Sequence, residues 1–168
     1  MAVIELAVVQ TPVDALTLAA RNGRVCLLHF GADDETVRQK LQRWYPAEPC
    51  ERHDDPAGAA SVLARYFGGD LAAIDEIPVE MNGTSFQKRV WGALRTVPAG
   101  KTASYAELAA RVGSPAAVRA VGAANGANPV AIVVPCHRII GSNGTLTGYG
   151  GGLERKMWLL RHEGGRLF

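Results

Sequence analysis

Three apolar stretches near the start of the chain predict β-strands. Residues 3–9, 16–20 and 25–30 are hydrophobic and rich in β-prone side chains, and turn-forming residues separate them. Asn22-Gly23, between the second and third stretches, is a strong signal for a tight hairpin turn. The pattern therefore predicts a small antiparallel sheet.

The pattern then changes to helical spacing. Residues 33–44 carry apolar side chains at i, i+4 and i+7, and residues 58–67 form one apolar stripe, so we expect a helix from each. Between them, residues 46–56 are polar and predict a linker. Residues 74–79 predict a short extended segment.

Two capping boxes mark helix starts in the second half. Thr84 is followed three residues later by Gln87, and Ser104 by Glu107, each just before an apolar stripe. The first box predicts a helix through residue 94. The second predicts a helix that Gly113 ends.

A third helix is expected over residues 116–124, with Ser114 as its N-cap and Pro115 in its first turn. Two short helices joined by a glycine turn predict a helix-turn-helix. The third helix consists mostly of small residues, which suit close packing on a neighbouring helix as well as DNA contact. Its one long cation, Arg119, favours insertion beside or into a base stack.

Candidate chemistry lies directly after a β-branched run. Residues 130–134 predict a buried strand, and Pro135 ends it because proline cannot donate to a ladder. Cys136, His137 and Arg138 follow. Basic neighbours lower the pKa of a thiol, so we interpret Cys136 as a reactive nucleophile. The alternative is a buried structural cysteine.

A glycine-rich loop and a last helix complete the chain. Residues 147–152 hold Tyr149 among glycines, and residues 153–160 predict the helix. No strand precedes the loop in nucleotide-fold order, so we reject a dinucleotide site. An aromatic ring held in this way suits the wall of a flat pocket.

Charge divides the 168 residues into two parts. Residues 1–80 hold 7 Lys/Arg and 13 Asp/Glu, a net charge of −6, whereas residues 81–168 hold 11 Lys/Arg and 3 Asp/Glu, a net charge of +8. We predict two domains with these bounds. The basic domain is expected to meet a polyanion and the acidic one to face away from it.

The number of cysteines and the hydropathy pattern indicate the cellular compartment of the protein. Three cysteines, an odd number, argue against a disulfide framework and for a reducing environment. We see no signal-peptide pattern and no apolar run of membrane-spanning length. We therefore expect a cytoplasmic protein without membrane association.

A zinc site was weighed for the first domain. Cys26 and His29, and Cys50 and His53, have ligand types that zinc prefers. Positions three apart on a strand point to opposite faces, however. We prefer a core role for Cys26 and a surface position for His53, and predict no metal and no cofactor.

The second half resembles a known family over about residues 83–165. The matching residues are Phe86, Gln87, Val90, Trp91, Ser104, Tyr105, Arg119, Ala120, Val121, Gly122, Asn128, Pro129, Pro135, Cys136, His137, Arg138, Tyr149, Gly150, Gly151, His162, Glu163 and Gly164. Together they resemble the O6-alkylguanine-DNA alkyltransferases. The resemblance implies a small N-terminal ribonuclease-H-like α/β domain. It also implies a C-terminal winged-helix-like helix-turn-helix domain that carries the active site.

The resemblance also implies a role for each catalytic residue. Cys136 would accept the alkyl group, and Glu163 would orient His137, which deprotonates Cys136 through a bound water. Asn128 would tie the recognition helix to the active-site segment. Tyr105 would rotate the nucleotide and donate to the leaving guanine.

Binding residues follow from the same resemblance. Arg119 would fill the gap in the base stack, and Tyr149 would line the pocket of the flipped base. The DNA-binding candidates are Arg119, Tyr105, Val118, Ala120, Gly122 and Asn125. The pocket candidates are Tyr149, Gly150, Ile139, Val130 and Met81.

The implied function is direct reversal of DNA damage. The protein would move the alkyl group of O6-alkylguanine, and of O4-alkylthymine, from a flipped base to Cys136 in one irreversible turnover. Its partner would be the minor groove of double-stranded DNA, bound as a monomer, with clustering along DNA left open. Two alternatives remain: a helix-turn-helix DNA binder without covalent chemistry, and a cysteine hydrolase that uses Cys136 and His137.

Overall fold

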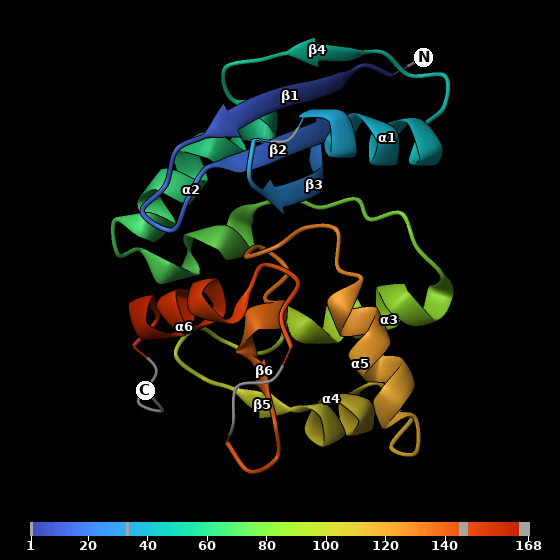
Figure 1. The fold of residues 1–168 in the computed structure, drawn as a ribbon, viewed down its shortest axis with the longest axis vertical. Helices are drawn as coiled ribbons and strands as arrows, with labels where there is room; N and C mark the ends of the chain where they lie inside the picture. Colours follow the sequence, from blue (N-terminus) through green and yellow to red (C-terminus); the bar gives the residue numbers. More distant parts are fainter. Residues whose placement is uncertain (1, 33, 145–147, 165–168) are drawn as a thin grey trace. The chain divides into compact units, whose positions relative to one another are not determined.

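A computed structural model of the chain describes residues 2–32, 34–144 and 148–164. The chain divides into two compact units, Met1–Asn82 and Gly83–Phe168 (Figure 1). The expected starts of the first helix at Asp33 and of the glycine-rich loop at Thr147 lie outside the described residues. None of the helices in the described ranges is long and apolar enough to span a bilayer.

The first unit is built on a four-stranded sheet. Its strands are β1 Ile4–Val9, β2 Leu16–Arg21, β3 Arg24–Phe30 and β4 Cys50–Arg52, in the order β3-β2-β1-β4. The first three pair antiparallel as predicted, and β4 pairs parallel to β1, so the sheet is mixed. The prediction of a linker over residues 46–56 was wrong at β4, because three partly polar residues leave too short a pattern to detect.

The hairpin between β2 and β3 confirms the turn prediction. Asn22 and Gly23 both have positive φ, 53° and 74°, as a two-residue turn of the primed type requires. The register of the pair shifts between Ala19 and Ala20. Residues 16–20 are all buried, so this hairpin supplies the centre of the first core.

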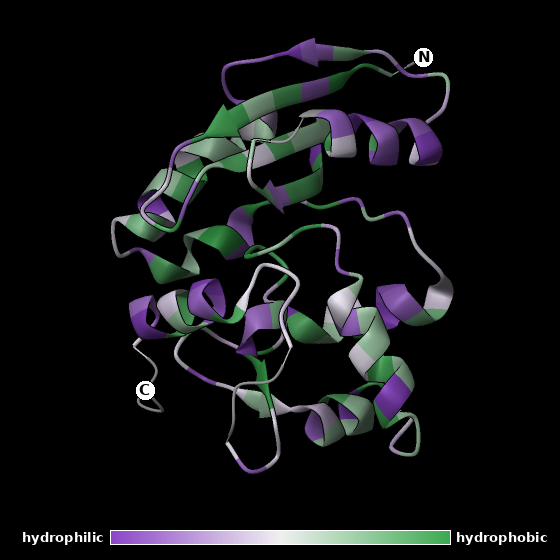
Figure 2. Cartoon of the chain, in the orientation of Figure 1, coloured by the Kyte–Doolittle hydropathy of each residue, from purple (hydrophilic) through white to green (hydrophobic). Residues whose placement is uncertain are grey.

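Two predicted helices cover this unit, α1 Asp34–Trp44 and α2 Ala59–Phe67. Val37 and Leu41 of α1 are buried in one cluster with strand residues, whereas the rest of α1 is mostly hydrophilic (Figure 2). A 3-10 helix, η1 Pro56–Gly58, precedes α2.

The prediction of an extended segment over residues 74–79 was largely wrong. Leu71–Glu76 forms a 3-10 helix, η2, which buries Ala73 and Ile74. Only Val79 makes a β-bridge, to Val25 at the free edge of β3. The apolar positions are too few here to separate a short helix from a strand.

The second unit is mainly helical. Its helices are α3 Ser85–Leu94, α4 Tyr105–Arg111, α5 Val118–Gly126 and α6 Leu153–His162. A short parallel pair, β5 Ala103–Ser104 and β6 Ile139–Ile140, was not predicted because each strand has only two residues. Both predicted capping boxes are formed, at Thr84 and at Ser104.

The start of α5 corrects one expectation. Ser114 does not cap the helix; its carbonyl accepts a hydrogen bond from Ala117 N at 2.9 Å and closes a separate turn. Ala117, with φ −98° and ψ 37°, is the N-cap, and α5 starts at Val118. The helix is held further along by the Trp91 indole, whose Nε1 donates to Ala124 O at 2.8 Å.

The expected strand over residues 130–134 is instead a buried series of turns. Val134 N donates to Val130 O at 3.0 Å, and Val133 N donates to Ala131 O at 2.8 Å. Ile132 has φ 70°, a strained value for a β-branched residue. Burial was predicted correctly, but the backbone satisfies its hydrogen bonds locally rather than in a ladder.

Candidate active site

Cys136 is the first residue of a 3-10 helix, η3 Cys136–Arg138, in the second unit. It is 7% exposed. Burial raises the pKa of its thiol, against the opposing influence of the Asn128 side chain, the charge of Lys156 and the Tyr149 side chain. The prediction that His137 and Arg138 lower this pKa was therefore wrong: burial dominates, and the cation that acts on the sulfur is Lys156. Such a thiol needs a base.

His137, Arg138 and Glu163 form one buried cluster. His137 Nε2 lies 3.0 Å from Glu163 Oε2, and both side chains are 0% exposed. Arg138 donates from Nε to Glu163 Oε1 at 2.9 Å and from Nη2 to Oε2 at 2.7 Å. Its Nη1 donates to Val97 O at 2.7 Å. Arg138 thus serves the carboxylate, a role that its place beside Cys136 did not indicate.

The charges of this cluster fix its protonation. Burial alone would raise the pKa of Glu163, but its interactions with His137 and with the Arg138 guanidinium outweigh burial, and the pKa is lowered. Burial lowers the pKa of His137 more than Glu163 raises it. An ionised carboxylate only accepts, so the neutral imidazole carries its proton on Nε2.

The second ring nitrogen of His137 is left as an acceptor. Nδ1 is buried and has no hydrogen-bond partner among the described residues. A neutral imidazole whose Nε2–H is held by a carboxylate has its lone pair on Nδ1. The cluster therefore offers a buried base one residue along the chain from Cys136.

Asn128 joins two segments of the second unit. Its Nδ2 donates to Val134 O at 2.7 Å, and its Oδ1 accepts from Val130 N at 3.0 Å. Asn128 lies two residues beyond the end of α5. One side chain thus fixes the segment between α5 and Cys136.

Lys156 is a site residue that sequence reasoning missed. It lies on α6, is 0% exposed, and donates from Nζ to Ile139 O at 2.5 Å. Burial lowers its pKa to about 8, against the influence of Cys136. The signal was present: Lys156, Leu159 and Leu160 have i, i+3, i+4 spacing on the buried stripe of α6.

The exposure of residues along α5 bears on the two interpretations of its small residues, close packing on a neighbouring helix and contact with DNA. Val118, Arg119 and Ala120 are exposed, and so are Ala123 and Gly126, whereas Val121 and Ala124 are buried. The small residues are therefore divided between an exposed face and a face that packs on α3 and α4. A Cβ at Gly122 would lie 3.7 Å from Cδ1 of Tyr105, so Tyr105 packs against α5. Asn125 is 4% exposed, and its side chain does not belong to the exposed face.

The pocket candidates differ in their placement. Val130 and Ile139 are 0% exposed, Tyr149 is half-buried beside the Cys136 thiol, and Gly150 is exposed. Met81 is half-buried and belongs to the first unit, whereas the other pocket candidates belong to the second.

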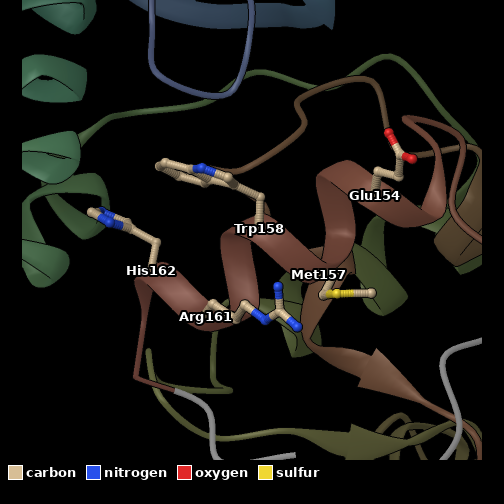
Figure 3. A pocket seen from close by; sticks show the side chains of 5 residues that line it. All are labelled: Glu154, Met157, Trp158, Arg161 and His162. Atoms are coloured by element: carbon tan, nitrogen blue, oxygen red, sulfur yellow. The ribbon is translucent and has the colours of Figure 1, made fainter. Parts of the chain in front are cut away.

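A hollow of about 600 Å³ lies along α6 (Figure 3). It is lined by Glu154, Met157, Trp158, Arg161 and His162. The rings of Trp158 and His162 stack with centroids 5.0 Å apart. None of these five residues is a candidate site residue.

The residues weighed for zinc do not converge. Cys26 is buried and donates weakly to Ala19 O, and burial raises its pKa to about 12. His53 pairs instead with Glu5 at 3.0 Å. In the part of the chain that the structure describes, no three His, Cys, Asp or Glu side chains gather as a metal site would need.

Fold and site together define a helix-turn-helix protein in which a buried cysteine directly precedes, in sequence, a buried histidine–arginine–glutamate cluster. Residues 85–165 match the family model described as "6-O-methylguanine DNA methyltransferase, DNA binding domain". A methylated-DNA–protein-cysteine methyltransferase of Salmonella typhimurium is 55% identical over 132 residues, which is 77% of each chain. That of Mycolicibacterium paratuberculosis is 48% identical over 160 residues, 95% of this chain and 92% of its own.

A solved structure shows the same fold. The O6-methylguanine methyltransferase of Mycobacterium tuberculosis is 40% identical, with a TM-score of 0.79 over 95% of this chain and 92% of its own. The same protein has been solved in complex with DNA. The chain therefore belongs to the methylated-DNA–protein-cysteine methyltransferase family. The likeness confirms the predicted two-part fold class, with a mixed rather than purely antiparallel sheet.

Proposed function

We propose that this protein repairs O6-methylguanine in double-stranded DNA by taking the methyl group onto Cys136. The observation that carries the proposal is the buried cluster in which Glu163 holds His137 3.0 Å away, next in sequence to the buried Cys136 thiol. A DNA-binding helix alone does not need a buried base beside a cysteine. A transfer reaction does.

The first step makes the thiolate. Because burial raises the pKa of Cys136, a base must take its proton, and the free Nδ1 of His137 is the acceptor in the site. A water between the two side chains would relay the proton. Glu163 then stabilises the imidazolium, and Lys156 supplies a positive charge near the sulfur.

The second step transfers the methyl group. The Cys136 sulfur forms a bond to the methyl carbon while the bond from that carbon to guanine O6 breaks. The electron pair passes to the guanine ring, which takes a proton from the Tyr105 hydroxyl. The His137 imidazolium then releases its proton to water and the tyrosinate regains one from water, so both side chains return to their neutral forms. The product on the protein is a neutral thioether, which has no proton to lose and cannot become a thiolate again. Each molecule therefore reacts once.

The lesion must leave the duplex to reach a buried sulfur. Flipping a base costs a few kcal/mol of stacking and pairing. The exposed small face of α5 suits close approach to the minor groove, with Arg119 as the side chain that fills the gap. Tyr105 packs against α5 at Gly122, and in this proposal it crowds the phosphate of the rotated nucleotide.

The same chemistry extends to O4-alkylthymine. Its alkyl group also sits on an exocyclic oxygen of a ring that can accept the electron pair. Tyr149, Val130 and Ile139, the residues we assign to the pocket, would give it an aromatic and apolar wall that does not require a purine. We propose this as a second, slower substrate.

Intact-mass measurement tests the proposal. The protein is mixed with a duplex that holds one O6-methylguanine, and the peptide that contains Cys136 is then mapped. We expect one methyl group per protein on that peptide and no second turnover. Binding of the lesion without a mass change would favour a damage-recognition protein; turnover of a small ester or amide would favour a hydrolase. Cys136→Ser is the matched control, which should bind the duplex and gain no methyl group.

A further inference from the structure

A cationic furrow lies between α3 and α4, apart from the cysteine site. The hollow measures about 490 Å³ and is lined by Arg89, Gly92, Ala93, Thr96, Arg111 and Val112. We call these six residues the α3–α4 furrow. None of them belongs to the site described above.

The furrow is built from one exposed stripe of α3. Arg89, Gly92 and Ala93 lie along one side of α3 with i, i+3, i+4 spacing, and Thr96, in the turn after the helix, continues this side. Small residues occupy the middle of the stripe, so the helix backbone forms a shallow floor. A Cβ added at Gly92 would meet nothing within 4 Å, so the floor is open above this residue.

An arginine stands at each end of the stripe. Arg111 donates from Nη1 to Thr96 Oγ1 at 3.1 Å, and Thr96 Oγ1 donates to Ala93 O at 2.6 Å. This chain of bonds holds the Arg111 guanidinium over the furrow while using one of its five donors among the described contacts. Arg89 lies 5.5 Å from the centre of the Phe86 ring.

The charges point to an anion. The described lining residues include two arginines and no carboxylate. Of the 3 acidic residues in residues 81–168, Glu163 is buried against Arg138 and Glu107 serves in a capping box. Arginine binds phosphate through paired hydrogen bonds, and two arginines without a counter-ion suit consecutive phosphates of a nucleic acid.

We propose that the α3–α4 furrow binds the sugar–phosphate backbone of the duplex outside the lesion. The inference rests on the proposed function, because the duplex must be held by α5. Arg111 ends α4, and the chain passes from there through a short turn into α5. The stripe from Arg89 to Thr96 extends about 10 Å, a length over which one DNA strand carries about three phosphates. The furrow positions the duplex and reads no base.

The test compares matched variants in a Cys136→Ser background, so that binding is measured without transfer. Arg111→Gln removes one cation, and Lys101→Gln removes an exposed cation that does not line the furrow. Gly92→Glu places a carboxylate in the floor, and Gly92→Gln places a neutral side chain of the same shape. Affinity for a long and a short lesion duplex is measured over a range of salt concentrations, with thermal unfolding to verify folding.

We expect Arg111→Gln to lower the slope of log affinity against log salt by about one on the long duplex. Its affinity should fall about tenfold at low salt, as expected for one lost charge-assisted contact. Gly92→Glu should weaken binding more than Gly92→Gln. On a duplex too short to reach the furrow, the parent and the furrow variants should bind alike.

Two results would overturn the furrow proposal. One is a salt slope for Arg111→Gln equal to that of Lys101→Gln. The other is an effect of Arg111→Gln only on cooperative binding of several proteins, which would make a second copy of the chain the occupant. The methyl transfer of the protein with Cys136 intact is measured in parallel. Absence of methyl transfer would refute the proposed function. Normal transfer together with an unchanged salt slope for Arg111→Gln would refute the furrow proposal alone.

Discussion

His137 Nε2 and Glu163 Oε2 lie 3.0 Å apart with both side chains removed from solvent. They are 26 residues apart in the chain. Because the ionised carboxylate only accepts hydrogen bonds, this contact decides which nitrogen of the neutral imidazole holds the proton. The same carboxylate accepts two bonds from Arg138. One acidic side chain therefore sets the tautomer of the base and neutralises a buried cation.

Glu163→Gln should separate these two duties. The amide still accepts from His137 but faces Arg138 with a donor, which leaves a buried guanidinium without its counter-charge. We expect the single-turnover transfer rate to fall about 100-fold. The free energy of unfolding should fall by about 3 kcal/mol. Rapid-quench transfer assays and denaturant unfolding measure the two quantities.

The double variant Arg138→Met/Glu163→Gln is the control. It removes the unpaired cation and should recover much of the stability but not the rate; recovery of both would reduce Glu163 to a structural role. The pH dependence carries a second check. Since the pKa of Glu163 is lowered on folding, its contribution is present above about pH 4.5 and is lost on acidification. The difference in stability between the parent and Glu163→Gln should therefore shrink below pH 4.5.

Lys156→Met should trade activity for stability. Burial lowers the pKa of Lys156 from 10.5 to about 8, so the folded state at neutral pH carries a buried ammonium at a cost of roughly 3 kcal/mol. Methionine removes that cost. It also leaves Ile139 O without its donor, which destabilises the folded state by about 1–3 kcal/mol. We expect unfolding stability near or above that of the parent, and a slower transfer because the thiolate loses its neighbouring cation.

The pH profile distinguishes this role from simple packing. Between pH 8 and 10.5 the unfolded chain binds more protons at Lys156 than the folded chain, so this group adds stability as the pH rises. Subtracting the Lys156→Met profile from the parent should leave a rise confined to that window. A flat difference would mean that the ammonium is not destabilised by burial.

Arg119→Ala should affect duplex repair and spare the chemistry. Arg119 is exposed on α5, whereas Cys136, His137 and Glu163 are buried. Without a side chain to fill the gap in the base stack, nothing offsets the few kcal/mol that flipping the base costs. We expect transfer from a lesion duplex to slow about 10- to 100-fold and reaction with free O6-methylguanine base to stay within about twofold. Equal losses on both substrates would exclude a stack-filling role.

The sequence predicts those features of the structure that depend on residues close together in the chain. Capping boxes and the Asn22-Gly23 turn are local, and the structure confirms them. The run through Ile132 was correctly predicted as buried but wrongly as a strand, because hydropathy does not record where backbone hydrogen bonds go. The spacing of Lys156 with Leu159 and Leu160 on α6 is enough to predict its burial, but not its partner, Ile139 O, a backbone atom 17 residues away.

The site shows the same division. The Pro135-Cys136-His137-Arg138 run, through its resemblance to a known family, was enough to propose the nucleophile and base. It did not reveal that Arg138 pairs with Glu163 and that Lys156 supplies the cation near the sulfur. Those pairings depend on tertiary contacts of α6 and η3, which no local pattern encodes.

Gly83→Ala tests how tightly α5 is positioned. A Cβ at Gly83 would lie 2.5 Å from Cη2 of Trp91 and 2.9 Å from Gln87 Oε1. The Trp91 ring is buried and cannot yield freely, and its Nε1 holds Ala124 O of α5 at 2.8 Å. We expect a loss of about 1–3 kcal/mol of unfolding free energy, as for other overpacked cores. Displacement of α5 should also slow transfer from duplex DNA.

Gly92→Ala is the matched control on the same helix. Its added Cβ meets nothing within 4 Å, and alanine in an exposed helix interior stabilises by up to about 1 kcal/mol relative to glycine. The two variants add the same methyl group, so their opposite effects would be due to Trp91. If Gly83→Ala loses stability but keeps the parent's transfer rate, the indole bond to Ala124 does not position α5. If it loses neither, the close approach of Gly83 to Trp91 is not required by the fold.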